Sequence, residues 1–205
     1  MAMRKMVVLV VLVAALAGCA VGLVKSRVTA FHRLPGDVSG MRYMLVPTRS
    51  QAASLEYRRY ADIVRENLRG RGMEEVSRAE DADVLVVISY AIDGGKVVRD
   101  DPIVIDRPTR ITGHVDRHGY FTGRTRGGPI VIGGGSSIQY ERFFALDMLD
   151  AASALKGEIR KLYEGRVVSR GRSSAIAAVM PAMIRALFKN FPGESGKTYV
   201  VMSGT

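Results

Sequence analysis

QAASLEYRRYADIVRENLR, residues 51–69, and DVLVVISY, residues 83–90, decide the fold that we expect of this chain. In the first stretch apolar residues recur at the spacing of one helix face, which predicts an amphipathic helix that packs on a core. Ser50 is placed to cap its start, and Gly70 and Gly72 are placed to end it. The second stretch is rich in β-branched residues, as buried central strands are, so the pair predicts an α/β (α+β) protein with helices packed on a sheet. The apolar residues of the expected helix are Ala52, Leu55, Tyr60, Ile63, Val64 and Leu68.

Weaker patterns along the rest of the chain complete this fold. Ser173 or Ser174 is placed to cap a second main helix that runs to about Asn190. Pro181 inside this helix is expected to kink it or to delay its start. Further strands are expected at residues 27–31, 41–46, 138–149, 158–169 and 198–202. Because two of these strands read as a hairpin, the expected sheet is mixed and largely antiparallel, with two main helices packed on it.

Residues 93–137 form the irregular part of the sequence. They hold ten of the 22 glycines, three of the seven prolines and two of the three histidines. Apolar triplets at 103–105 and 130–132 predict short strands or a hairpin within an extended insertion rich in Gly and Arg. The glycine run at 133–135 is typical of a flexible segment.

The first 18 residues have the layout of a secretory signal. A basic pair at 4–5 is followed by an apolar run of eleven residues at 6–16, and small residues then precede Cys19. The run is too short for a membrane-spanning helix, which needs about 20 apolar residues. The expected parts of the chain are a removed signal peptide at 1–18, a tether at 19–26 and a single domain at 27–205.

Cys19 is the only cysteine, and the tetrad Leu16-Ala17-Gly18-Cys19 resembles the lipobox of bacterial lipoproteins. In those proteins the cysteine thiol receives a diacylglyceryl group, the chain is cut before the cysteine, and the new amino terminus is acylated. The resemblance implies cleavage between Gly18 and Cys19 and a covalent N-acyl and S-diacylglycerol lipid on Cys19, with no other cofactor. Enteric lipoproteins kept at the inner membrane carry aspartate where this chain has Ala20, so the resemblance implies the outer membrane. The alternatives are an ordinary secretory signal with an incidental cysteine, or an uncleaved anchor.

The composition favours an anionic partner. Without residues 1–18 the chain keeps 187 residues and a net charge of +8, because Arg4 and Lys5 account for two of the +10 charges of the full sequence. That excess favours phospholipid headgroups or glycans, and export argues against nucleic acid. The densest basic stretch is a candidate anionic-surface contact, with a solvated loop as the alternative reading. Its residues are Arg107, Arg110, Arg117, Arg124 and Arg126.

Three motifs lie in the C-terminal third of the chain. They are Leu146-Asp147-Met148-Leu149-Asp150-Ala151, Leu162-Tyr163-Glu164-Gly165-Arg166-Val167-Val168, and a helix from Met183 that ends at Phe191-Pro192. Together with the tetrad at Cys19, the first helix and the strand that begins at Asp83, they resemble a family of bacterial envelope lipoproteins whose domain is designated domain of unknown function 4136. The resemblance covers most of residues 24–193. It implies a compact α/β domain on the periplasmic side of a membrane, and it implies no particular activity.

The sequence offers weak signals for catalysis or metal binding. His114 and His118 are four residues apart, which on a helix would place both rings on one face, as in zinc enzymes. Gly113 and Gly119 flank the segment, so we expect a surface loop there and no metal site. The glycine clusters lack the lysine of a phosphate-binding loop, and no serine stands in a G-x-S-x-G pattern. We therefore expect no catalytic residues and no enzymatic activity.

These observations lead to one functional expectation and two alternatives. We expect a non-catalytic structural or interaction module of the bacterial cell envelope, held to the outer membrane by its lipid, with its domain facing the periplasm. Its partners would be envelope proteins, the cell wall or an anionic glycan. The first alternative is a regulator (activator) of a peptidoglycan-synthesis enzyme that binds through residues 99–126, and the second is a hydrolase that uses His114 and His118.

Overall fold

The computed structural model describes residues 23–99, 103–105, 110–115, 121–126, 130–132 and 135–204. Its elements in chain order are β1 (Leu23–His32), β2 (Arg42–Leu45), α2 (Leu55–Arg69), β3 (Glu74–Glu75), the 3-10 turn η1 (Ala79–Asp81), β4 (Val84–Ile92), β5 (Lys96–Arg99), β6 (Ile103–Ile105), β7 (Arg110–Val115), β8 (Phe121–Arg126), β9 (Ile130–Ile132), β10 (Ser136–Asp150), α3 (Ala151–Leu155), β11 (Lys161–Gly171), α4 (Ile176–Phe188) and β12 (Thr198–Gly204).

The main sheet is mixed and mostly antiparallel, as the sequence predicts. Its strand order is β12–β1–β11–β10–β4–β2–β3, and β5 pairs with the first residues of β10. β1 runs antiparallel to both β11 and β12, and β10 runs antiparallel to β4. The short strand β2 is parallel to β4 and to β3. The expected hairpin of two long strands is thus the centre of the sheet, where β11 and β10 are neighbours.

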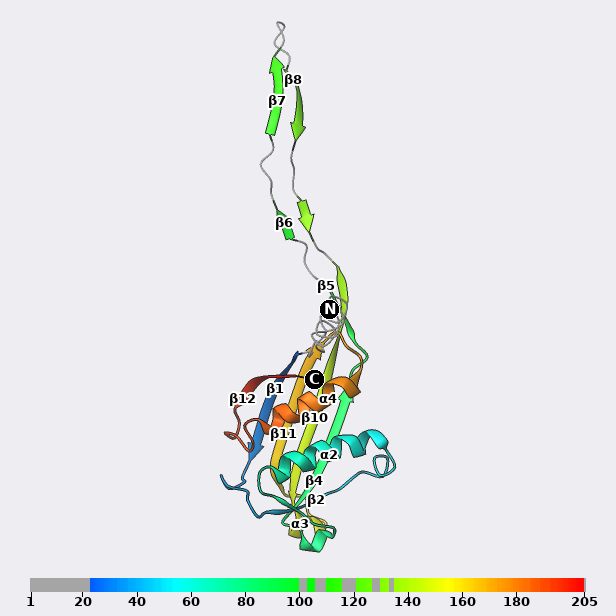
Figure 1. Cartoon of the computed structure of the whole chain (residues 1–205), viewed down its shortest axis with the longest axis vertical. Helices are drawn as coiled ribbons and strands as arrows, with labels where there is room; N and C mark the ends of the chain where they lie inside the picture. The colour runs from blue at the N-terminus through cyan, green and yellow to red at the C-terminus, as the bar shows by residue number, and fades with distance from the viewer. Residues whose placement is uncertain are drawn as a thin grey trace, which may run out of the picture. The chain divides into compact units, whose positions relative to one another are not determined.

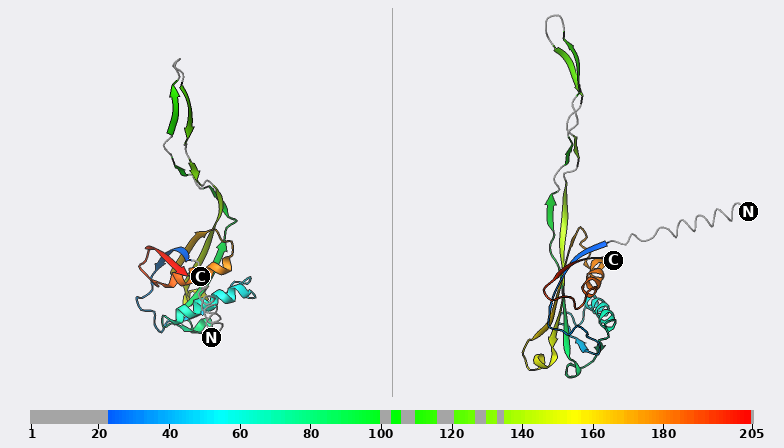
Figure 2. Two further views of the ribbon diagram at one scale, coloured as in Figure 1. Left: turned by 45° about the horizontal axis from the view of Figure 1, so that its top comes forward. Right: turned by 90° about the vertical axis from the view of Figure 1, so that its left-hand side faces the viewer.

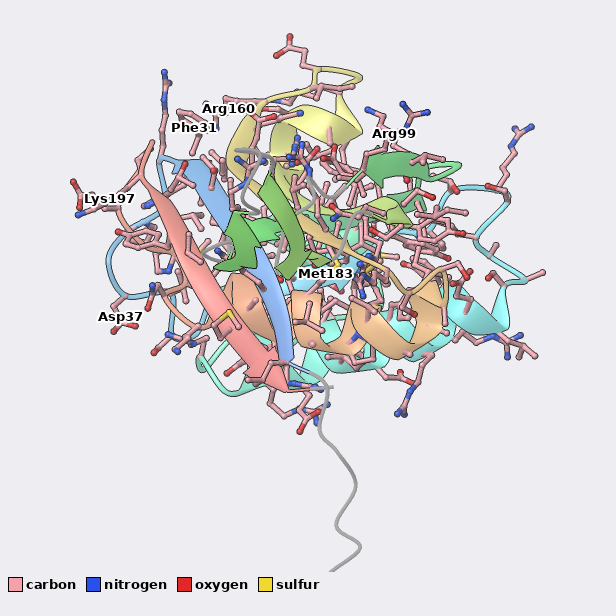
Figure 3. All side chains as sticks on the ribbon, turned by 90° about the horizontal axis from the view of Figure 1, so that it is seen from above. Phe31, Asp37, Arg99, Arg160, Met183 and Lys197 are labelled. Carbon is pink, nitrogen blue, oxygen red and sulfur yellow. The ribbon has the colours of Figure 1, made fainter. Side chains whose placement is uncertain are left out.

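Helices α2 and α4 cover one face of the main sheet (Figures 1 and 2). The strands alternate between buried and exposed residues, as β1 shows with Val24 and Val28 in the core and Lys25 and Arg27 in solvent. Met183, labelled in Figure 3, belongs to the α4 stripe and is fully buried. The buried residues of α4 are Val179, Met180, Ala182, Met183, Ile184, Ala186, Leu187 and Phe188.

The first predicted helix forms, but it begins one turn later than expected. Ser54, not Ser50, is its N-cap, because the Ser54 hydroxyl accepts a hydrogen bond from the Tyr57 backbone N–H. With this start Ala52 lies before the helix and is exposed, Leu55 faces the solvent, and Tyr57 lies in the core instead. The stripe of Tyr60, Ile63, Val64 and Leu68 is buried as predicted.

The final helix also forms, without the predicted cap. Ala175 occupies the N-cap position and no side chain caps it, so the expectation of Ser173 or Ser174 is wrong. Pro181 lies inside the helix and does not delay its start, which is at Ile176. The apolar stripe holds the helix on the sheet despite the backbone hydrogen bond that a proline cannot make.

β1 begins at Leu23, four residues earlier than the predicted strand. Residues 23–26, expected to belong to the tether, pair on one side with β12 and from Ser26 with β11. Because the strand is bonded on both sides, its polar residues Lys25 and Ser26 do not end it.

The chain divides into two compact units. Among the described residues, the first unit contains 23–92 together with 141–170 and 175–204, and the second contains those within 93–140 together with 171–174. The second unit corresponds to the stretch expected to be irregular, yet its described residues form three antiparallel ladders. The triplets 103–105 and 130–132 pair with each other as β6 and β9, as the sequence suggested. The ladder of β7 and β8 was not expected.

A short capped helix connects the two long strands. The strands predicted at residues 138–149 and 158–169 form as β10 and β11, and α3 lies between them. The Asp150 carboxylate accepts a hydrogen bond of 2.8 Å from the Ser153 N–H and one of 2.7 Å from the Arg160 guanidinium. Hydrogen bonds from the Ser153 side chain, from Arg160 and from the Ser153 N–H lower the pKa of Asp150 to about 2.

The approach of α4 to β11 depends on Gly165. A Cβ atom at this position would lie 2.7 Å from Leu187 Cδ1 and 2.7 Å from Tyr163 Cε1. Leu187 and Tyr163 are both buried, so neither side chain has free space to move into. The glycine therefore sets how closely the helix packs on the sheet.

Replacing Gly165 with alanine is expected to lower the free energy of unfolding by about 1–3 kcal/mol, because the added methyl group overpacks the contact between α4 and β11. Chemical denaturation of wild type and G165A measures the difference. Gly36→Ala is the matched control, since a Cβ there meets nothing within 4 Å, and it should change stability by less than about 0.5 kcal/mol. Equal stability of G165A and G36A would contradict this packing.

The Asp150 carboxylate should make the stability of the fold depend on acid. Its pKa in the folded chain is about 2, below the value of about 3.9 for an unperturbed aspartate. The stabilisation is therefore present above about pH 4 and is lost as pH falls toward 2. Unfolding experiments between pH 5 and 2 should show a steeper loss for wild type than for D150N. Parallel pH profiles of the two proteins would show that the carboxylate contributes nothing.

Candidate functional site

Five of the nine candidate residues predicted from the sequence lie outside the described residues. These include the proposed lipid site at Gly18 and Cys19, and also Arg107, Arg117 and His118. Arg110, Arg124, Arg126 and His114 lie in the described strands β7 and β8.

The β7–β8 ladder brings three of the nominated arginine positions together. Arg110 stands opposite Arg126, and Arg124 stands opposite Thr112. Since residues two apart on a strand share a face, these three arginine positions belong to one face of the hairpin. The opposite face has Ile111 at a position facing Thr125. The expected basic surface is thus compatible with the backbone register of this hairpin.

The zinc-enzyme reading of the two histidines is not compatible with the backbone. His114 lies in the strand β7, opposite Thr122, so the four-residue helical spacing to His118 does not apply at His114. In the parts of the chain that the structure describes, no group of three or more His, Cys, Asp or Glu side chains is arranged to hold a metal ion.

A groove that the sequence did not nominate lies where β1 ends and β11 begins. It has a volume of about 480 Å³. Phe31 and Ile159 line it and are 55% and 77% exposed, which is high for large apolar side chains. Phe31 and Arg160 lie near each other in Figure 3. The groove also contains His32, Lys161, Glu164 and Ser195.

His32 ties the groove to the loop before β12. Its Nε2 lies 3.0 Å from the Gly193 carbonyl oxygen, which can only accept, so Nε2 carries the proton. Its backbone N–H donates to the Ser195 hydroxyl at 3.0 Å. The ring thus bonds Gly193 rather than Ser195, and the pair does not form the serine–histidine arrangement of a nucleophilic enzyme.

The charges beside the groove are largely paired. Lys161 Nζ lies 2.6 Å from Glu164 and 3.2 Å from Asp147, and Arg166 lies 2.5 Å from Asp147. Arg160 is held by Asp150 at 2.7 Å. Paired charges attract an anion weakly, so the exposed apolar side chains are the main binding feature of the groove.

The sheet face opposite α2 and α4 is uncovered in the described part of the first unit (Figure 2). A second hollow of about 290 Å³ lies on this face, lined by Lys25, Arg27, Val168 and Arg170. Neither hollow could be found from the sequence, because the lining residues of each come from strands about 130–145 positions apart that only the β1–β11 register brings together. The signal available in the sequence was the alternation of apolar and polar residues in β1, but the predicted strand began only at residue 27 and so missed residues 23–26.

None of the helices in the described ranges has the length and apolar character needed to span a membrane.

Comparisons with known proteins agree with the motifs of the C-terminal third. No curated protein matches the sequence. A PDZ domain protein from Parabacteroides distasonis ATCC 8503 is similar at 10% identity and a TM-score of 0.43, over 88% of this chain and 39% of that one. A PelC dodecamer from Paraburkholderia phytofirmans is similar at 10% identity and a TM-score of 0.40, over 83% of this chain and 99% of that one. The family model described as Domain of unknown function (DUF4136) matches residues 29–193, and the chain therefore belongs to this family.

Proposed function

We propose that this protein is a lipoprotein of the bacterial cell envelope whose domain is a non-catalytic structural or interaction module. The observation that carries the proposal is the tetrad Leu16-Ala17-Gly18-Cys19, which follows an eleven-residue apolar run and holds the only cysteine of the chain. An N-acyl and S-diacylglycerol lipid on Cys19 holds the domain at the membrane. Ala20 directs the protein to the outer membrane, with the domain in the periplasm.

The surface of the domain supports binding rather than catalysis. The groove at Phe31 and Ile159 offers exposed apolar side chains, and the charges beside it are engaged in ion pairs. Exposed apolar side chains suit contact with an envelope protein, whereas the paired charges leave little to attract an anionic glycan at this groove. The module is therefore expected to act by contact.

Cells fed a clickable palmitate analogue should incorporate the label into the wild-type protein and not into Cys19→Ala, because the chain has no other thiol. Gel fluorescence after the click reaction measures the label, and immunoblotting confirms that both proteins are made. Cys19→Ala that still carries label, or wild type that never does, refutes the lipid anchor. Membrane fractionation of the labelled protein tests the outer-membrane assignment, which fails if the label remains with the inner membrane.

A second function, regulation of a peptidoglycan-synthesis enzyme, is favoured by the β7–β8 register. The positions of Arg110, Arg124 and Arg126 share one hairpin face, which gives residues 99–126 a basic side for a protein partner.

A photo-crosslinking amino acid at Thr112 tests this regulator. Thr112 pairs with Arg124 and thus shares the basic face, whereas Thr125 pairs with Ile111 on the other face and is the matched control. The regulator predicts a stoichiometric adduct with one synthase from position 112 and at least tenfold less from position 125. Adducts with lipid or glycan alone, or equal yields from both positions, would exclude it.

A further inference from the structure

The start of β1 carries a surface of cations and apolar side chains on the face away from the helices. Leu23, Lys25 and Arg27 alternate onto this face and are exposed. The β12 register places Met202 opposite Lys25 and Val200 opposite Arg27. Together with Arg170 of β11, these residues form what we call the basic strand patch, namely Leu23, Lys25, Arg27, Arg170, Val200 and Met202.

The cations of the patch surround one hollow. Lys25, Arg27 and Arg170 line the 290 Å³ hollow together with Val168. Arg170 is paired with Glu141, but Lys25 and Arg27 form no ion pair with any residue that the structure describes. Two unpaired cations and a third beside them favour an anionic group in the hollow, which is large enough for a phosphate.

The apolar side chains beside these cations are unusually exposed to solvent. Leu23 is 69% exposed, Val200 59% and Met202 50%. A soluble glycan or free anion would gain nothing from them, whereas a membrane surface takes up cations at its phosphates and apolar side chains at the headgroup boundary. The mixture of the two kinds of residue thus fits a lipid surface best.

The covalent distance to Cys19 places the patch near a membrane. Leu23 is four residues from Cys19, and four residues span at most about 14 Å. If the lipid of the proposed function is present, the start of β1 stays within about that distance of the bilayer surface. Phe31, at the other end of β1, is eight residues farther along, which is about 27 Å of strand.

We propose that the basic strand patch docks on anionic phospholipid headgroups of the membrane in which the Cys19 lipid is inserted. Lys25, Arg27 and Arg170 hold the phosphate groups, and Leu23, Val200 and Met202 enter the headgroup layer. Docking orients the first unit, with the start of β1 toward the bilayer and the groove at Phe31 away from it. This inference rests on the proposed lipidation of Cys19 for its geometry, but the patch itself makes a separate prediction.

The test uses the membrane-extracted full protein reconstituted in vesicles, with an environment-sensitive NBD dye on Met202→Cys. When Cys19 is lipidated, the introduced cysteine is the only free thiol. The control is wild type treated with the same dye, which should then take up none. The fluorescence emission of the dye should shift to shorter wavelength in phosphatidylglycerol vesicles and not in phosphatidylcholine vesicles. Adding 1 M salt should reverse this shift. A dye on Ile159→Cys, in the groove at the other end of the sheet face, should show no shift in either.

Neutralising the patch should undock it. The double variant K25Q/R27Q should lower the docked-to-undocked ratio about 30-fold, from about 1 kcal/mol per cation near an anionic surface. The control R33Q/R160Q removes the same charge from Arg33 and Arg160, which both line the groove at the other end of β1, and should leave the ratio within about twofold.

The possible results distinguish a failure of the proposed docking from a failure of the proposed lipidation of Cys19. Equal dye signals in the two kinds of vesicle would overturn the proposed docking of the basic strand patch, and so would a K25Q/R27Q variant that docks like wild type. Either result holds even when mass spectrometry finds lipid on Cys19. A dye shift with whole envelope fractions but not with phosphatidylglycerol also overturns it, in favour of another envelope polymer. If wild type takes up the dye, Cys19 is a free thiol and the proposed function fails, while added vesicles still decide whether the patch prefers anionic lipid.

Discussion

The contact between α4 and β11 at Gly165 is the constraint on which the rest of the domain depends. Only a residue without a side chain lets Leu187 lie so close to the sheet beside Tyr163. This contact buries the apolar stripe of α4, and α2 extends the same helical layer over β2 and β4 (Figure 1). Because both helices cover one face of the sheet, the side chains on the other face are exposed to water and are stabilised by contacts among themselves.

That second face explains most of the surface chemistry of the first unit. Ion pairs such as Arg166–Asp147 and Arg170–Glu141 join neighbouring strands there. The exposed apolar residues between them are not needed for the core, which lies on the helix side. Their exposure has a cost in water, so a face of this kind is where a binding partner or a membrane contributes most.

The sequence was sufficient where a pattern repeats over several turns or strand positions. The stripes of α2 and α4, the buried strand β4 and the paired triplets β6 and β9 were all predicted, as was the mixed, largely antiparallel sheet. The sequence did not predict where some helices and strands begin or which strands pair with β1. Ser50 and Ser54 are both suitable caps by residue type, and the start at Ser54 is the one that buries Tyr57 and exposes Leu55, which local sequence does not reveal. Strand β1 reaches Leu23 because β11 and β12 bond it on both sides, which no local pattern reveals.

The candidate sites divide in the same way. The tetrad at Cys19 is a contiguous motif and is visible in the sequence, while the arginines of β7 and β8 were nominated by density and acquire a common face only through the register. The groove at Phe31 and the basic strand patch each combine β1 with residues more than 120 positions away, so sequence density gave no sign of them. Local chemistry can be predicted from a single chain, but surfaces built by strand pairing need the fold.

We propose that this domain works from a lipid anchor at Cys19, and the mass of its amino-terminal peptide is the decisive measurement. Tandem mass spectrometry of protein extracted from membranes should find a peptide that begins at Cys19 and carries a diacylglyceryl group on sulfur and an acyl group on nitrogen. An amino terminus at any other residue, or an unmodified Cys19 thiol in the membrane-extracted protein, would rule out the lipid anchor.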